Sequence, residues 1–254
     1  MVESLIFIKE RIATIIHKPE IEPKGLVILC AGYLDSKDYE HLSGLAKDLS
    51  KVGYIVVRFD STGIWDSKGT IDQYTIPQQL EDIQDIIDYM FKEKTYNNVI
   101  IGGHSLGGFV ALLYAASHPI ITKTFAIMSP YALSRNINIK KTLRLENSGI
   151  RVSLRDVPGK NDKREFHVPF SNFEDASQYN LLNEVPKLKI PILFIAGEMD
   201  DVIPATKVEL IFKNSNEPKK ILVMKGMDHD YRHNLEQINL VNKEVINFLD
   251  STNL

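Results

Sequence analysis

The sequence predicts one α/β domain with a mostly parallel central sheet flanked by helices. Short apolar runs bounded by Gly, Pro or Asp alternate with longer segments of helical period, a pattern typical of βαβ units. The length of 254 residues suits one large domain better than two small ones. Because 44% of the residues are hydrophobic, such a domain has enough apolar side chains for a sizeable core.

The expected elements follow the apolar pattern along the chain. Residues 76–93 show it most clearly, since Leu80, Ile83, Ile87 and Met90 recur at three- and four-residue steps and form one helical stripe. Strands are expected at residues 5–9, 12–17, 26–30, 54–59, 98–101, 123–128, 192–196 and 220–223. Helices are expected at residues 41–51, 76–93, 106–117, 205–212 and 235–249, and the first two strands should pair as an antiparallel hairpin at one edge.

Residues 131–189 break this alternation. Polar and basic residues mix there with Phe166, Phe170 and Phe173. A connection of that length inside a compact domain is usually a functional excursion, or else its elements have been misassigned. We therefore expect a cap inserted at about residue 131 to 189 of a single domain that spans residues 1–254. Its phenylalanines either line an apolar acyl or aryl pocket or pack against one another.

Composition and charge exclude several classes of partner. The formal net charge of −3 gives no global attraction to nucleic acid or to an anionic membrane. Cys30 is the single cysteine, so no intrachain disulfide can form. The N-terminal residues lack the pattern of a signal peptide, and no run approaches the roughly 18 apolar residues of a membrane span. We expect a cytoplasmic protein without stable membrane insertion, for which a homodimer stays open.

A candidate nucleophile lies between an expected strand and an expected helix. The residues Gly103-His104-Ser105-Leu106-Gly107 match G-x-S-x-G, directly after the strand at 98–101 and at the start of the helix at 106–117. This setting places a serine on a sharp turn above the sheet, where flanking side chains would collide with neighbouring elements. We therefore expect Ser105 to be a nucleophile, while His104 should be structural and point away from it.

An acid and a base follow the serine in chain order. A serine hydroxyl needs an imidazole to take its proton and a carboxylate to orient that imidazole. Asp200 and Asp201 both lie on the loop after the strand at 192–196, and position alone does not choose between them. His229 follows the strand at 220–223, and His233 is the weaker alternative base.

Two backbone amides are expected to form an oxyanion hole. One is the amide of Leu106, the residue after the nucleophile, and the other is that of Tyr33, on the loop after the strand at 26–30. No cluster of Cys and His with metal-ligand spacing is present, so neither a metal nor an organic cofactor is expected.

With these residues assembled, the chain resembles the serine α/β-hydrolases. In particular it resembles short-cap cinnamoyl (feruloyl) esterases and monoacylglycerol-lipase-like hydrolases of the serine aminopeptidase S33 type. The family pattern G-x-x-D-x-x-V-P matches Gly197, Asp200, Ile203 and Pro204, which selects Asp200 over Asp201. The pattern G-x-D-H matches Gly226, Asp228 and His229, and the segment from Arg58 to Gly69 resembles a second family loop.

The sequence departs from the family at two loops. Ala31-Gly32 stands where His-Gly is usual, and Ile64-Trp65 stands where a second His-Gly is usual. Trp65 is therefore expected near the site, where it would influence the substrate that binds.

The resemblance implies the α/β-hydrolase fold and a serine esterase with a Ser105-Asp200-His229 triad. It would act without a cofactor on a small-molecule ester of a small to medium acyl or aryl group. The same triad serves a thioesterase, an amidase or an acyltransferase, and these alternatives stay open. A hydrolase-like binding protein without catalysis is the alternative from another class.

Overall fold

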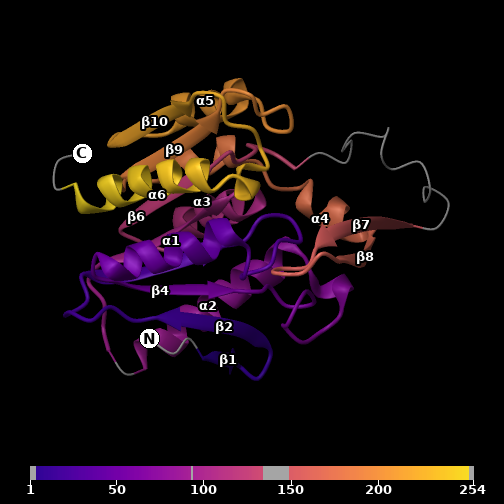
Figure 1. Cartoon of the computed structure of the whole chain (residues 1–254). Helices are drawn as coiled ribbons and strands as arrows, with labels where there is room; N and C mark the ends of the chain where they lie inside the picture. Colours follow the sequence, from indigo (N-terminus) through magenta and orange to yellow (C-terminus); the bar gives the residue numbers. More distant parts are fainter. Residues whose placement is uncertain (1–3, 93, 134–148, 252–254) are drawn as a thin grey trace.

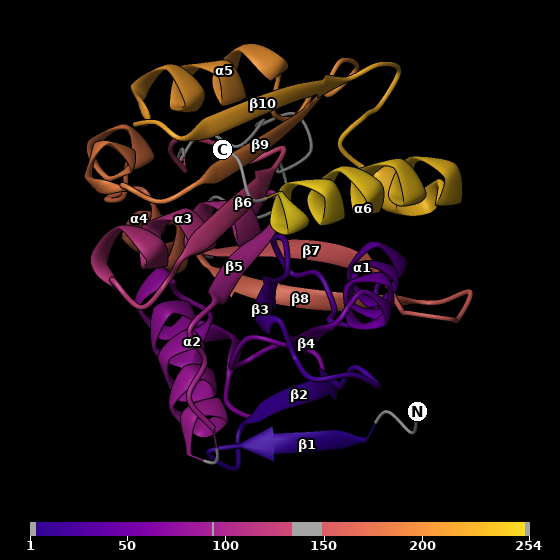
Figure 2. The same cartoon turned by 90° about the vertical axis from the view of Figure 1, so that its left-hand side faces the viewer.

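The central element is a sheet of eight strands whose order is β1-β2-β4-β3-β5-β6-β9-β10. The computed structural model describes residues 4–92, 94–133 and 149–251. Strands β1 and β2 are antiparallel to each other, β2 is antiparallel to β4, and all later pairs are parallel. Figure 2 shows the order from β1 at one edge to β10 at the other. The strands are β1 (Leu5–Ile8), β2 (Ile12–His17), β3 (Gly25–Cys30), β4 (Tyr54–Phe59), β5 (Val99–His104), β6 (Lys123–Ile127), β9 (Ile192–Gly197) and β10 (Lys219–Met224).

Five longer helices cover the two faces of this sheet. Helices α1 and α6 lie on one face, in front of the strands in Figure 1, and α2, α3 and α5 cover the other. Strand β3 is buried throughout, and alternate residues serve the two cores: Leu26 and Ile28 face one, Val27 and Leu29 the other. No helix in the described part of the chain is long and apolar enough to cross a bilayer. The helices are α1 (Glu40–Lys51), α2 (Ile76–Phe91), α3 (Leu106–Ser117), α5 (Ala205–Asn214) and α6 (Leu235–Asp250).

These elements confirm the predicted α/β fold class. All eight expected strands and five expected helices occur, and their ends differ from the predicted ones by three residues or fewer. The expected edge hairpin is β1–β2.

The segment predicted as a cap contains a second, separate sheet of two strands. Strand β7 (Ile150–Asp156) pairs antiparallel with β8 (Lys163–Pro169), and the short helix α4 (Phe170–Ala176) follows directly. We call β7 and β8 the cap hairpin; Figure 1 shows it beside one end of the large sheet. Of the predicted cap, residues 134–148 lie outside the described residues. Sequence reasoning missed the hairpin although residues 150–155 (Ile-Arg-Val-Ser-Leu-Arg) alternate apolar and polar side chains with the period of two that is typical of a strand.

Candidate active site

Ser105 lies on a strained turn between β5 and α3. Its backbone has φ 54° and ψ −119°, in a region that non-glycine residues rarely occupy. The Ser105 N–H donates to the Ile127 carbonyl of β6 at 2.8 Å, which holds the turn against the sheet. This conformation places the Ser105 hydroxyl at the carboxyl end of the parallel strands, where loops from several strands meet.

The two glycines of the motif are required by close backbone contacts. A Cβ atom added at Gly103 would lie 2.2 Å from the Cys30 carbonyl oxygen, and one added at Gly107 would lie 2.1 Å from the same atom. Both contacts are with backbone of the central strand β3, which cannot move aside as a flexible side chain can. The Cys30 carbonyl oxygen is therefore the atom that excludes a side chain at both glycines of the motif.

The three side chains expected to form a triad lie in hydrogen-bond contact. His229 Nε2 is 3.0 Å from Ser105 Oγ, and His229 Nδ1 is 2.8 Å from Asp200 Oδ2. Ser105 precedes α3, Asp200 follows β9, and His229 follows β10. Each residue follows a strand of the same parallel sheet, so the sheet brings together groups that are 124 and 29 residues apart in the chain.

Asp200 differs sharply from its neighbour Asp201. Asp200 is buried, and its Oδ1 accepts hydrogen bonds from the backbone N–H groups of Val202 at 2.9 Å and Ile203 at 2.7 Å. Its Oδ2 remains for His229. Asp201 is exposed. The backbone bond from Met199 N–H to the Met227 carbonyl, at 2.9 Å, ties the acid loop to the histidine loop.

The two amides expected to form an oxyanion hole belong to Tyr33, on the loop after β3, and to Leu106, the first residue of α3. Within the described residues, neither the Tyr33 N–H nor the Leu106 N–H donates a hydrogen bond to another protein group. Leu34 adopts a positive φ of 53°, and both of its backbone groups are held: Tyr74 Oη accepts from its N–H at 3.0 Å, and its carbonyl accepts from Trp65 Nε1 at 2.9 Å. The loop is thus fixed while the Tyr33 amide stays available.

The aromatic residues predicted to contact substrate fall into two groups. Trp65 and Phe166 are 9% and 5% exposed and pack edge to face, with ring centroids 5.3 Å apart. Phe173 is half-buried, 5.9 Å from the Tyr33 ring and 6.2 Å from that of Phe170. Phe173 is therefore adjacent to Tyr33 on the loop after β3, and Phe170 lies beside Phe173. Trp65 holds the same loop through its bond to the Leu34 carbonyl. Whether any of the four touches substrate stays a prediction.

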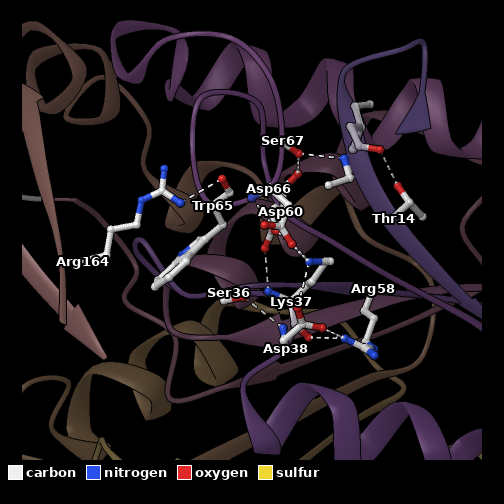
Figure 3. A network of polar contacts seen from close by, with 12 residues as sticks. Thr14, Ser36, Lys37, Asp38, Arg58, Asp60, Trp65, Asp66, Ser67 and Arg164 are labelled. Carbon is white, nitrogen blue, oxygen red and sulfur yellow. Dashed lines mark hydrogen bonds and ion pairs between the residues drawn. The ribbon is translucent and has the colours of Figure 1, made fainter. Parts of the chain in front are cut away.

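A buried ion cluster joins the loop after β3 to the loop after β4 (Figure 3). Lys37 is 1% exposed, and its ammonium lies 2.9 Å from Asp38, 3.1 Å from Asp60 and 2.6 Å from Asp66. Burial alone would lower the pKa of Lys37, but the three carboxylates outweigh it and the pKa is raised above its ordinary value. Sequence reasoning missed Lys37, because a lysine in a polar loop carries no sign that it will be buried.

A second polar cluster, formed by Asp35, His41 and His104, lies beside His229. Asp35, His41 and His104 are 4%, 2% and 3% exposed, and the His104 ring centroid is 4.8 Å from that of His229. His104 is thus buried beside the candidate base. In the described part of the chain, no ring nitrogen of His41 or His104 has a hydrogen-bond partner. Burial lowers the pKa of His41 to about 3 and also lowers that of His104.

This second cluster also offers metal-ligand atoms. One ligand atom from each of Asp35, His41 and His104 lies within 4.8 Å of the others. Burial alone would raise the pKa of Asp35, but neighbouring His104 and Arg155 lower it to about 2, so the carboxylate is ionised. Arg155 Nη1 lies 3.9 Å from Asp35 Oδ1 and already balances part of its charge. A divalent cation would meet repulsion from that guanidinium.

The buried imidazole of His41 predicts a pH-dependent stability. Its pKa is below the unfolded value of 6.5, so the unfolded chain binds the proton more readily and acid favours unfolding. His41→Phe keeps a ring against His104 and Tyr231 but cannot bind a proton. As the pH falls below about 6, wild type should lose unfolding free energy relative to the variant by about 1.4 kcal/mol for each pH unit. Urea denaturation of both proteins from pH 8 to pH 5 measures this, and parallel curves would contradict the assignment.

Sequence reasoning also missed the residues that hold the loops after β3 and β4. Besides Tyr74, Arg155 of the cap hairpin donates to the Tyr33 carbonyl, and Arg164 donates to the Trp65 carbonyl at 2.9 Å. These contacts join segments 40 to 122 residues apart. No local pattern predicts them.

Comparison with known proteins adds several relatives. The chain is 24% identical over 226 residues to an acyl transferase of Photobacterium leiognathi, covering 85% of this chain and 69% of the relative. It is 21% identical over 210 residues to the mitochondrial palmitoyl-protein thioesterase ABHD10 of Bos taurus, covering 80% of this chain and 66% of the relative. The chain thus spans about two thirds of the length of these curated relatives.

Solved structures share the fold over nearly the whole chain. The Est1E structure with bound ferulic acid, from Butyrivibrio proteoclasticus, has a TM-score of 0.74 and 21% identity, covering 96% of this chain and 97% of that one. The monoacylglycerol lipase of Paleococcus ferrophilus has a TM-score of 0.72 and 20% identity, covering 94% of this chain and 98% of that one. The predicted resemblance to short-cap esterases and lipases is confirmed at the level of fold.

The family itself is identified by sequence. Residues 21–180 match the family described as Serine aminopeptidase, S33, and this match extends over more than half of the chain. The matched range begins before β3 and includes the strained serine turn and the cap hairpin. Together with the mostly parallel sheet, it shows that this chain is a member of the serine aminopeptidase S33 family of α/β hydrolases.

Proposed function

We propose that this chain is a serine hydrolase that cleaves carboxylic esters of small to medium acyl or aryl groups. The observation that carries the proposal is the position of His229, whose two ring nitrogens contact Ser105 Oγ at 3.0 Å and Asp200 Oδ2 at 2.8 Å. A neutral imidazole held in this way accepts the serine proton at Nε2 while Nδ1–H donates to the carboxylate. The substrate is a small molecule, and no metal or cofactor takes part.

The first half of the reaction forms an acyl-enzyme. His229 Nε2 takes the proton of Ser105 as Oγ attacks the ester carbonyl carbon, and the carbonyl oxygen becomes an oxyanion. The amides of Tyr33 and Leu106 donate to that oxygen. When the tetrahedral intermediate collapses, the bond to the leaving alcohol breaks and His229 returns its proton to the alcohol oxygen.

The second half restores the serine. His229 removes a proton from water, whose oxygen attacks the acyl carbon, and the bond to Ser105 Oγ then breaks as Oγ regains the proton from His229. Asp200 keeps the imidazole in the required tautomer throughout. Its two bonds from Val202 and Ile203 prevent the carboxylate from turning away.

Covalent labelling tests the nucleophile directly. A fluorophosphonate probe should modify Ser105, because the activated hydroxyl attacks phosphorus as it would attack a carbonyl carbon. Peptide mass spectrometry after proteolysis locates the label. Ser105→Ala should abolish both the labelling and the hydrolysis of p-nitrophenyl acetate.

Ser129 provides the matched control for this experiment. Its side chain is buried and its Oγ donates to the Pro130 carbonyl at 3.2 Å, so Ser129→Ala removes a hydroxyl that bonds to a backbone carbonyl instead of an imidazole. That variant should still be labelled at Ser105. Label on another residue of the wild-type chain, or undiminished turnover by Ser105→Ala, would overturn the proposal.

Thioester cleavage or acyl transfer is the second candidate function. It is favoured by two relatives, of which one is named an acyl transferase and the other a palmitoyl-protein thioesterase. The acyl-enzyme is common to all three reactions, and the acceptor decides the product. Adding a primary alcohol to the ester assay and quantifying the new ester against the free acid separates transfer from hydrolysis.

A further inference from the structure

Three arginines lie on the inner face of the cap hairpin. In its antiparallel register Arg151 is opposite Val168, and Arg155 is opposite Arg164. Between these pairs Ser153 is opposite Phe166. Alternate residues of a strand share a face, so these six side chains lie on one side of the hairpin. Phe166 and Val168 are 5% and 1% exposed, which shows that this side faces the body of the protein.

Two of these arginines are used to hold loops. The Arg155 guanidinium donates to the Tyr33 carbonyl, and the Arg164 guanidinium donates to the Trp65 carbonyl at 2.9 Å. Both bonds connect the cap hairpin to the loops that surround the oxyanion site. These bonds explain why Arg155 and Arg164 lie on the inner face of the hairpin.

Arg151 has no such partner among the described residues. No carboxylate or carbonyl of that part of the chain accepts a hydrogen bond from its guanidinium or forms an ion pair with it. Its central carbon instead lies 5.7 Å from the centre of the Tyr33 ring and 5.5 Å from that of the Phe173 ring. Rings beside a guanidinium hold it by cation–π contact but leave its five N–H donors unpaired. A half-buried guanidinium in this state matches a planar carboxylate in a bidentate pair.

We propose that Arg151 binds a carboxylate carried by the ester that Ser105 attacks, so that the enzyme prefers anionic esters. This inference rests on the proposed function, because Tyr33 connects the two sites. In that function the backbone amide of Tyr33 donates to the oxyanion, while the side-chain ring of Tyr33 contacts Arg151. Ser153 Oγ lies 3.4 Å from Tyr33 Oη, which keeps the Tyr33 ring against the same face of the hairpin.

The experiment compares two pairs of esters that differ by one negative charge. In the leaving-group pair, para-carboxyphenyl butyrate is compared with its methyl ester; in the acyl pair, monomethyl adipate is compared with dimethyl adipate. The ratio of kcat/KM between the charged and neutral member is measured for each pair. Wild type should favour the charged member of one pair by about tenfold, mainly through KM, since a charge-assisted bidentate pair is being formed. The pair that shows the preference tells which end of the ester carries the carboxylate.

Arg151→Met removes the charge but keeps a long apolar side chain between the two rings. Its ratio should fall about tenfold for the pair that wild type discriminates. Lys160→Met is the matched control, because Lys160 is exposed in the turn of the same hairpin and its loss changes the net charge equally. That control should keep the wild-type ratio.

Two results would overturn the inference alone. In the first, wild type cleaves the charged and the neutral member of both pairs with equal kcat/KM; in the second, the preference for the charged member persists in Arg151→Met. A failure of the proposed function is distinguishable, because then no ester is cleaved and the fluorophosphonate leaves Ser105 unlabelled.

Discussion

Replacing Asp200 by asparagine is expected to lower kcat for ester hydrolysis about 10⁴-fold while the protein stays folded. The two backbone N–H groups of Val202 and Ile203 require an acceptor, so the asparagine oxygen should face them. The side-chain NH₂ would then donate to His229 Nδ1. That bond stabilises the tautomer with a proton on Nε2, which cannot accept the proton of Ser105.

Asp201→Asn is the matched control. It makes the same chemical change one residue along the loop, at an exposed carboxylate, and should leave kcat within about twofold of wild type. Steady-state kinetics of both variants on p-nitrophenyl acetate, with circular dichroism to confirm folding, makes the comparison. A large loss of kcat in Asp201→Asn, or near-normal kcat in Asp200→Asn, would contradict the assignment of Asp200 as the acid of the triad.

Gly107→Ala is expected to destabilise the protein by about 3 kcal/mol. The added methyl group would lie 2.1 Å from the Cys30 carbonyl oxygen, 2.6 Å from its carbonyl carbon and 2.7 Å from the Ala31 carbonyl oxygen. All three atoms belong to the backbone of β3 and the loop that follows it. Relief therefore requires that α3 moves away from the central strand, which opens the packing of both.

Gly44→Ala is the contrasting variant, because the chemical change is identical and the space is different. The nearest atoms to an added methyl group at this position in α1 are 3.7 Å away, which is ordinary van der Waals contact. Alanine should stabilise the helix by about 0.5–1 kcal/mol. Urea denaturation measures both values. If Gly107→Ala retained wild-type stability, the close approach of α3 to β3 would not be a constraint on the fold.

The order of elements could be predicted from sequence because each carries a local signal. The apolar runs of buried strands and the stripe of α2 depend on residues close together in the chain, and such patterns define the parallel α/β fold. The strained serine was predictable for the same reason, since Gly103 and Gly107 adjoin it. Asp200 could be distinguished from Asp201 by a family pattern, and in the structure burial separates the same two residues.

The cap was less predictable, because its contacts are not local. Arg151, Arg155 and Arg164 appear in the sequence as ordinary polar residues of a mixed segment. Only the pairing of β7 with β8 places all three on one face, toward Tyr33, Phe173 and Trp65.

The sequence by itself determined the fold class, the strained turn at Ser105 and the candidate residues of the triad, because periodicity and close backbone packing constrain neighbouring residues. Only the tertiary structure decided that Trp65 donates to the Leu34 carbonyl, that Lys37 is buried among three carboxylates, and that Arg151 contacts two aromatic rings and, among the described residues, no carboxylate. The physical reason is that hydrogen bonds and charges act through space. Their partners come from segments that the chain brings together only after the sheet has formed.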